Sequence, residues 1–396
     1  MRISTNMIFD SNVAALNQQQ ARLLQTQQQI ASGRKLLTAS DDPVAATRAL
    51  AVSQSDATNT QYASNRNMAR NALSMAETTL QNVTSLLQDV RDAALSAGNG
   101  LLTDSNRSAI ASDLKGRLQE LVGLANSTDG IGNYLFSGFQ SRTKPFAVDA
   151  AAGATYAGDD GQRNIQVSAS RQMASSDSGA DVFMRVKNGN GAFVTQPAVA
   201  NTGTGIISVG NVVNTALLTG HDYSITFTSA TTYDVTDTTT ATPVSSGNAY
   251  VSGQAISFDG MQFDIKGIPA AGDTFTVTPS VNENIFKTVS DLIGALNTPV
   301  AGANLSNSLL HSVNQLDSAL NNVLNTRVTL GLRLNEVDAL DAAGEDLGLQ
   351  FKKTLSELQD TDYNKAISDL AQQKMNLEAA QQSFVKVTGL SLFNYL

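Results

Sequence analysis

Residues 16–30 read LNQQQARLLQTQQQI, a glutamine-rich stretch in which Arg22 is the only charged side chain. Around this stretch the apolar residues Phe9, Leu16, Leu23 and Ile30 recur every seven positions. The positions between them change from valine to glutamine, and they are Val13, Gln20 and Gln27. Residues spaced alternately by four and three lie on one face of an α-helix. The spacing therefore predicts a helix whose seam is partly apolar and partly amide.

A seam with glutamine at core positions holds two helices together weakly, because polar residues there lower stability and instead select register and oligomeric state. Isolated helices of this length are marginal in water. We therefore expect the segment to be weakly ordered in a single chain and to become ordered when many copies pack, with its amides bonded to neighbouring chains. A solvent-exposed, glutamine-rich helix is the alternative.

The composition is that of a globular protein without disulfides. The 396 residues are 41% hydrophobic, carry a net charge of −9 and include no cysteine. The acidic balance argues against nucleic acid or an anionic membrane as main partner, since both require a basic surface. The lack of cysteine excludes disulfides, thiolate catalysis and cysteine-based zinc sites. With no apolar run of about 20 residues and no secretory signal, we expect a cytosolic chain or one exported by a route that reads no such signal.

Helix boundaries are marked at both ends of the next segment. Gly33 is placed to end the first helix in the left-handed conformation, and Asp42 before Pro43 offers a carboxylate N-cap and a proline in the first turn. The following helix keeps three–four spacing up to Gly98 through these residues: Leu73, Ala76, Leu80, Val83, Leu87, Val90 and Ala94. A shorter helix with an apolar face is expected to end at Asn126.

From about residue 141 the composition shifts to Thr, Ser, Val, Gly and Asp. Short runs alternate between apolar and polar residues: YSITFT (223–228), AISFDG (255–260), MQFDIKG (261–267) and DTFTVTP (273–279). Alternation bounded by Gly, Asp and Pro is typical of antiparallel strands joined by turns. We therefore predict a β domain over residues 141–281.

Helical patterning returns after residue 282. The longest seam runs from Leu309 to Leu358 and includes Arg327, Gly344 and Gly348, and the final helix carries Gln373 inside its apolar seam. The two ends of the chain thus match in pattern, which predicts an α+β fold. In it the N- and C-terminal helices pair into an elongated coiled-coil or helical-bundle rod with an inserted, projecting, mainly antiparallel β domain.

Three domains are expected on this basis: a terminal coiled-coil assembly domain (1–40 and 360–396), a helical rod domain (41–140 and 282–359) and a β-rich outer domain (141–281). Two unrelated helical domains that flank a β domain are the alternative.

Residues with catalytic potential do not converge in the sequence. His221 and His311 are far apart and have no carboxylate cluster beside them, so we predict ordinary surface or interface histidines and no metal site. Asp159-Asp160 lacks the alternating ligands and closing glutamate of a calcium loop and is better explained as a turn. We predict no enzyme activity and no cofactor; an activity linked to Asp159 or His221 would be required to reverse this prediction.

Several segments resemble the hook–filament junction proteins of the flagellin superfamily. IASGRKLLTASDDPVAATRAL (30–50) looks like the start of that family's first rod helix, with Pro43 after the aspartates. NYLFSGFQSRTKPF (133–146) and YAGDDGQRNIQVSASRQMASSDSGADVF (156–183) are similar to its exit into the β domain and first β segment. The C-terminal segment 360–396 is similar to its last helix, and the ending LSLFNYL separates the chain from filament flagellins. Residues 185–250 have no counterpart in this resemblance.

The resemblance implies a structural protein of the bacterial flagellum that is secreted by the flagellar type III apparatus. Its implied partners are copies of itself in a ring, the preceding hook-associated junction protein, flagellin, and an export chaperone at the C-terminal helix. A filament flagellin is one alternative, and a coiled-coil protein whose β insert recognises a ligand is another.

The seams supply the candidate assembly residues, which we expect to pack knobs-into-holes in the assembled tube. They are Phe9, Val13, Leu16, Leu23 and Ile30 near the N-terminus, and Leu370, Leu377, Phe384, Leu390, Leu392 and Phe393 near the C-terminus. The spacing does not distinguish packing within one chain from packing between chains, so both remain open.

Overall fold

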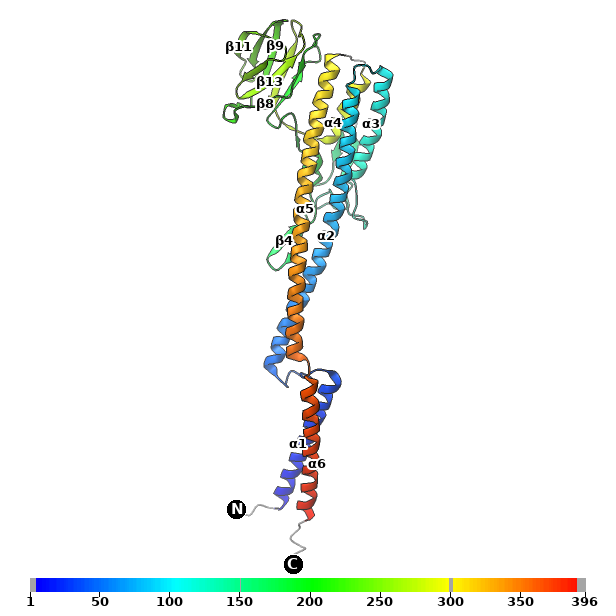
Figure 1. The fold of residues 1–396 in the computed structure, drawn as a ribbon, viewed down its shortest axis with the longest axis vertical. Helices are drawn as coiled ribbons and strands as arrows, with labels where there is room; N and C mark the ends of the chain where they lie inside the picture. The colour runs from blue at the N-terminus through cyan, green and yellow to red at the C-terminus, as the bar shows by residue number, and fades with distance from the viewer. Residues whose placement is uncertain (1–4, 150, 299–301, 390–396) are drawn as a thin grey trace, which may run out of the picture. The chain divides into compact units, whose positions relative to one another are not determined.

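The computed structural model describes residues 5–149, 151–298 and 302–389. Its helices lie toward the two ends of the sequence and its antiparallel strands between them, which confirms the predicted α+β class (Figure 1). The α-helices are α1 (Thr5–Ser32), α2 (Pro43–Ala97), α3 (Asp104–Ala125), α4 (Ile285–Asn297), α5 (Ala303–Gln359) and α6 (Tyr363–Gly389). The chain forms two compact units, residues 1–64 with 340–396 and residues 65–339, and α2 and α5 contribute to both.

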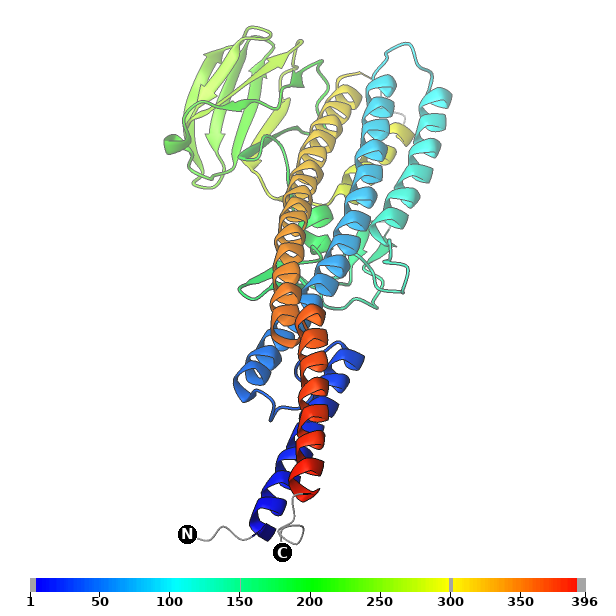
Figure 2. The same cartoon turned by 60° about the horizontal axis from the view of Figure 1, so that its bottom comes forward.

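In the first unit α1 and α6 run antiparallel and side by side, so the predicted pairing of the terminal helices is confirmed (Figure 2). Gly33 follows α1 with φ +70° and ends the helix as predicted. The segment after α1 then bonds to the end of α5 and the residues that follow it: Gly33 O accepts from Thr361 N at 2.9 Å, and Lys35 N donates to Gln359 O at 2.8 Å. The pair is therefore tied at one end by backbone hydrogen bonds.

Helix α2 begins with the predicted cap. Asp42 Oδ1 accepts hydrogen bonds from the backbone N–H groups of Val44 (3.0 Å) and Ala45 (2.9 Å), which satisfies donors that no helical carbonyl can reach. Farther along α2, Asn59 Nδ2 donates to Gly344 O of α5 at 2.8 Å. Gly344 of the predicted α5 seam therefore lies where the Asn59 side chain of α2 reaches the α5 backbone.

The helices of the second unit pack through the predicted seams. Leu73, Leu80 and Leu87 of α2 are fully buried. Arg327, a charged residue within the predicted α5 seam, is ion-paired with Glu77 of α2 at 2.7 Å. A charge is tolerated at this position because its partner lies on the facing helix and both side chains keep partial access to water.

Between α3 and α4 a short-stranded region packs around phenylalanines. It holds the hairpins β1 (Phe146–Asp149) with β2 (Gly153–Tyr156) and β3 (Asn164–Ser168) with β4 (Arg171–Ala174), and a π-helix over Ala180–Met184. The ring of Phe146 lies 5.4 Å from that of Phe183 and 5.2 Å from that of Phe286 on α4. This aromatic cluster joins the region to the helices.

The β module, residues 193–279, contains two antiparallel sheets. One has the order β11–β10–β9–β14–β6, and the other has the order β12–β13–β7 with β8 paired to β13. Their bounds are β6 (Phe193–Pro197), β7 (Ile206–Ile207), β8 (Asn211–Val212), β9 (Tyr223–Ser229), β10 (Thr232–Asp237), β11 (Thr242–Ala249), β12 (Ala255–Phe258), β13 (Met261–Lys266) and β14 (Thr274–Pro279). β5 (Val186–Lys187) and β15 (Asn282–Glu283) pair where the chain enters and leaves the module.

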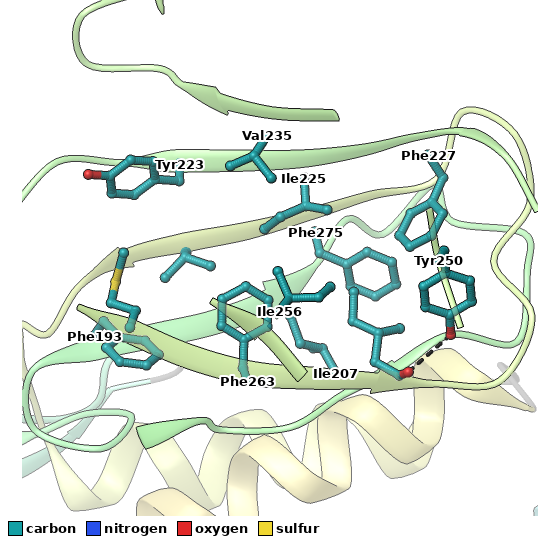
Figure 3. Close-up of a cluster of buried hydrophobic side chains, with 13 residues drawn as sticks. Phe193, Ile207, Tyr223, Ile225, Phe227, Val235, Tyr250, Ile256, Phe263 and Phe275 are labelled. Atoms are coloured by element: carbon teal, nitrogen blue, oxygen red, sulfur yellow. Dashed lines mark hydrogen bonds between the residues drawn. The ribbon is translucent and has the colours of Figure 1, made fainter. Parts of the chain in front are cut away.

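Alternation along the strands builds the core of the module. The buried side chains include Ile225 and Phe227 of β9, Phe263 and Ile265 of β13, and Phe275 of β14 (Figure 3). The four alternating runs of the sequence correspond to β9, β12, β13 and β14, so these strand predictions are confirmed.

Candidate assembly surface

The α1 half of the terminal pair presents the predicted apolar residues toward α6. Val13, Leu16, Leu23 and Ile30 are half-buried. Phe9 lies near the free end of the pair, 49% exposed, with its ring 5.3 Å from that of Phe384. Contact within one chain therefore covers these side chains only in part.

The α6 half follows its predicted seam. Ala366 is buried, and Leu370, Leu377 and Phe384 are half-buried. Three further predicted residues lie outside the described part of the chain: Leu390, Leu392 and Phe393.

The polar positions of the α1 seam differ from those predicted. Gln20 and Gln27 are exposed, and the neighbouring Gln19 and Thr26 lie in the seam instead. Thr26 is buried, and its Oγ1 lies 3.0 Å from Gln373 Oε1 of α6. The prediction was wrong by one position because a heptad of apolar residues fixes one line of the seam, and the second line can lie three or four residues away. The predicted amide in the α6 seam, Gln373, is confirmed.

A second set of apolar side chains on the pair points outward, and the seam spacing did not identify it. Leu24 is 52% exposed, Ile367 55% and Met375 65%. The adjacent leucines 23 and 24 were the available signal, since two consecutive residues of a helix cannot lie on one narrow seam. The pair thus has apolar surface beyond what its two helices use against each other.

Asp41 ties the α1–α2 linker to α1. Its carboxylate accepts hydrogen bonds from Thr38 N (2.8 Å), Leu37 N (2.9 Å) and Gln25 Nε2 (3.0 Å). The bond from Thr38 is the largest cause that holds the pKa of Asp41 below its ordinary value. Asp41 and Asp42 therefore both act as acceptors for backbone donors.

The histidines have structural surroundings. His221 Nδ1 lies 2.7 Å from Asp237 Oδ2 in the β module, a carboxylate neighbour that the sequence did not reveal. Burial would raise the pKa of Asp237, but hydrogen bonds from Thr240 and His221 outweigh it and lower the pKa to about 2. His311 is half-buried on α5, and burial lowers the pKa of its imidazole.

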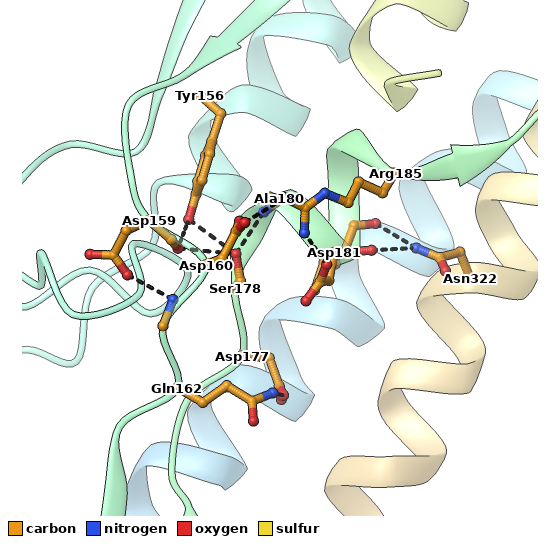
Figure 4. A network of polar contacts seen from close by, with 12 residues as sticks. Tyr156, Asp159, Asp160, Gln162, Asp177, Ser178, Ala180, Asp181, Arg185 and Asn322 are labelled. Atoms are coloured by element: carbon orange, nitrogen blue, oxygen red, sulfur yellow. Dashed lines mark hydrogen bonds and ion pairs between the residues drawn. The ribbon is translucent and has the colours of Figure 1, made fainter. Parts of the chain in front are cut away.

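Asp159 organises a turn, in agreement with its predicted role. Its Oδ1 accepts from Phe139 N (2.9 Å) and Gly161 N (2.8 Å). Its backbone carbonyl accepts from the Tyr156 hydroxyl at 2.8 Å (Figure 4). Asp160 pairs with Arg185 at 2.6 Å. The acidic pair is thus engaged in backbone and guanidinium contacts.

Two features that the described residues lack bear on other functions. No helix in residues 5–149, 151–298 and 302–389 has the length and apolarity needed to cross a membrane. Within the same ranges, His, Asp and Glu side chains form no group of three that could hold a metal ion.

Comparison with protein families links the chain to the flagellum at two places. Residues 3–141 match the bacterial flagellin N-terminal helical region. Residues 198–279 match the D2-like domain of flagellar hook-associated protein 1. The second match covers most of the β module, including residues 198–250 of the stretch that had no counterpart in the sequence resemblance.

Individual relatives match over far more of the chain. Flagellar hook-associated protein 3 of Salmonella typhimurium is 29% identical over 99% of both chains. The crystal structure of FlgL from Xanthomonas campestris is 30% identical with a TM-score of 0.72, over 77% of this chain and 99% of that one. The flagellar junction protein FlgL from Legionella pneumophila is 32% identical with a TM-score of 0.71, over 79% of this chain and all of that one. This chain therefore belongs to the hook-associated protein 3 (FlgL) family, the structural proteins of the flagellar hook–filament junction.

Proposed function

We propose that the α1–α6 pair is the surface through which this chain assembles into the flagellar shaft. Residues 1–40 and 360–396 would form the assembly domain, residues 41–140 and 282–359 a supporting helical rod domain, and residues 141–281 an outer domain. The eleven predicted seam residues, from Phe9 to Phe393, would then be shared between packing inside the chain and packing between chains.

The observation that carries the proposal is the apolar surface left on the pair. Leu24, Ile367 and Met375 are more than half exposed, although burial of such side chains contributes about 1.5–3 kcal/mol each when it is complete. We take these exposed apolar side chains as part of a contact site for another protein. Further chains that cover this surface would gain the burial that a single chain does not provide.

The neighbours that we propose are copies of the chain in a ring, the preceding hook-associated junction protein and flagellin. The match of residues 3–141 to the flagellin helical region supports a similar mode of packing for the N-terminal helix in both proteins. A ring of identical copies requires head-to-tail contacts whose rotation closes, so two different faces of the pair would meet.

We further propose that the chain leaves the cell through the flagellar type III apparatus, with a chaperone on α6 beforehand. Support comes from the exposed Ile367 and Met375, which a chaperone would cover in the cytosol. Replacing both with serine should weaken the export complex while leaving the β module folded. Unchanged chaperone retention by the double variant would argue against this part of the proposal.

The assembly proposal is tested with Leu377→Asp in a strain that lacks its own copy of the chain. We expect the variant to fold in its second unit, to be absent from isolated flagella and to let flagellin escape into the medium. Ile268→Asp, at a 68% exposed position of the β module, is the matched control and should assemble normally. Normal incorporation of Leu377→Asp would contradict the proposed role of the pair.

A further inference from the structure

The α1 seam has two polar positions seven residues apart, and they differ in how their hydrogen bonds are met. Thr26 faces Gln373 and has its partner within the chain. Gln19 Oε1 is buried yet has no hydrogen-bond partner among the described residues. Because buried acceptors are almost always satisfied in folded proteins, an unpaired one needs an explanation.

Gln19 is one of the residues that line a pocket between α1 and α6. The pocket has a volume of about 160 Å³ and is lined by Leu16, Gln19, Ala380, Ser383 and Phe384, together with Asn12 and Ala15. One buried water needs roughly 10–15 Å³ by the same measure. The space therefore has room for a side chain from outside.

The facing part of α6 explains why the chain leaves this acceptor unpaired. Thr26 faces the amide of Gln373, whereas Gln19 faces Ala380, whose methyl group cannot donate a hydrogen bond. Asn12 and Ser383 lie at the same pocket but do not donate to Gln19 Oε1. No described residue supplies a donor, and one from another molecule would satisfy this oxygen.

We infer that this pocket receives an outward-facing glutamine of α1 from a second copy of the chain, whose side-chain amide donates to Gln19 Oε1. The inference rests on the proposed function and specifies one contact within it. Exposed glutamines on α1 include Gln18, Gln20, Gln27 and Gln28, and each amide carries two donors.

The charge pattern of α1 permits the approach of a second α1. From Ser11 to Ser32 the only charged residue is Arg22, so two copies of this stretch meet with little like-charge repulsion. The predicted seam residues Gln20 and Gln27 are two of the four candidates for this contact.

Gln19→Met tests the inference because it should stabilise α1 in the single chain but weaken assembly into flagella. Methionine nearly conserves the volume of glutamine and removes the unpaired acceptor, so amide exchange of α1 in the full-length monomer should slow by roughly 5- to 30-fold. Incorporation into flagella should fall, since the incoming amide loses its acceptor. Thr26→Val, which removes a bond made inside the chain, is the control and should speed α1 exchange in the monomer.

Cysteine cross-linking identifies the occupant, and the cysteine-free chain makes each engineered thiol unique. Copies with Ser383→Cys are mixed with size-tagged copies that carry Gln18→Cys, Gln20→Cys, Gln27→Cys or Gln28→Cys, and flagella are isolated and oxidised. We expect disulfide-linked heterodimers with one of the α1 variants and none with Gln382→Cys of α6. Heterodimers with Gln382→Cys alone, or none at all, would overturn the inference.

The two proposals fail separately. Should Leu377→Asp block assembly while Gln19→Met assembles and exchanges like the unaltered chain, the pocket has no such role and the assembly surface stands. Should Leu377→Asp assemble normally, the assembly surface itself is wrong.

Discussion

Thr26 of α1 and Gln373 of α6 meet across the seam of the terminal helix pair, with Thr26 Oγ1 3.0 Å from Gln373 Oε1. The Thr26 hydroxyl also lies 3.1 Å from the Arg22 carbonyl, so one proton is shared between two acceptors. These polar atoms join two segments that are 347 positions apart in the sequence. A seam built this way fixes the register of the helices and contributes little net stability.

Removing the Thr26 hydroxyl should loosen the pair. In Thr26→Val the partner amide is left partly unsatisfied, which costs about 1–3 kcal/mol, and we expect faster amide exchange in both α1 and α6. Thr26→Ser keeps the hydroxyl and should exchange close to the unaltered chain. Equal exchange in the valine and serine variants would mean that the hydrogen bond does not hold the register.

Loss of the Asp42 carboxylate should fray the start of α2. Asp42→Ala leaves the N–H groups of Val44 and Ala45 without the acceptor that they now share, at a cost of about 1 kcal/mol. Asp42→Asn retains a side-chain oxygen and should behave like the unaltered chain. The measurement is the exchange rate of the first-turn amides of α2, which should rise in the alanine variant alone.

A side chain at Gly33 should strain the junction after α1. Its φ of +70° is unfavourable for other residues, and a Cβ there would lie 3.0 Å from the Tyr363 hydroxyl. Gly33→Ala should therefore destabilise the first unit by about 1–2 kcal/mol. Gly116→Ala, in α3 with open space around its Cβ position, is the opposite case and should stabilise that helix by about 1 kcal/mol. Equal effects of the two substitutions in thermal unfolding would contradict the assignment of strain to Gly33.

The β module should lose stability in acid through Asp237. Its folded pKa of about 2 lies below the ordinary 3.8, so the folded state binds the proton less readily than the unfolded state does. The stabilisation is therefore present above about pH 4 and is lost as the pH falls toward 2. Urea unfolding of the module, followed by tyrosine circular dichroism, should show a shallower decline over this range in Asp237→Asn. A decline as steep as in the unaltered chain would assign the effect to other carboxylates.

Sequence periodicity located the elements well where the pattern was long. The seams of α2, α5 and α6, the cap at Asp42 and the strands β9, β12, β13 and β14 all followed from spacing. The phase of the α1 seam did not, because glutamines stand at both 19 and 20 and only the facing residues of α6 decide between them. Short elements such as the π-helix at Ala180–Met184 depend on tertiary packing around Phe136 and Phe146, which no local pattern encodes.

The candidate assembly surface could likewise be predicted only in part. The half-buried seam residues recur at heptad spacing, whereas the outward Leu24, Ile367 and Met375 do not. The pocket at Gln19 arises from an alanine, Ala380, on the partner helix. Which helix faces which, and in what register, had to be known before the unpaired oxygen could be recognised.

Hydrogen exchange of α1 and α6, compared between the dilute full-length monomer and isolated flagella, tests the central claim most directly. If the pair is completed only by neighbouring chains, its amides should exchange rapidly in the monomer and should be strongly protected in the assembled state. Strong protection of residues 5–32 and 363–389 in the dilute monomer would contradict the account, because the pair would then close fully without its neighbours.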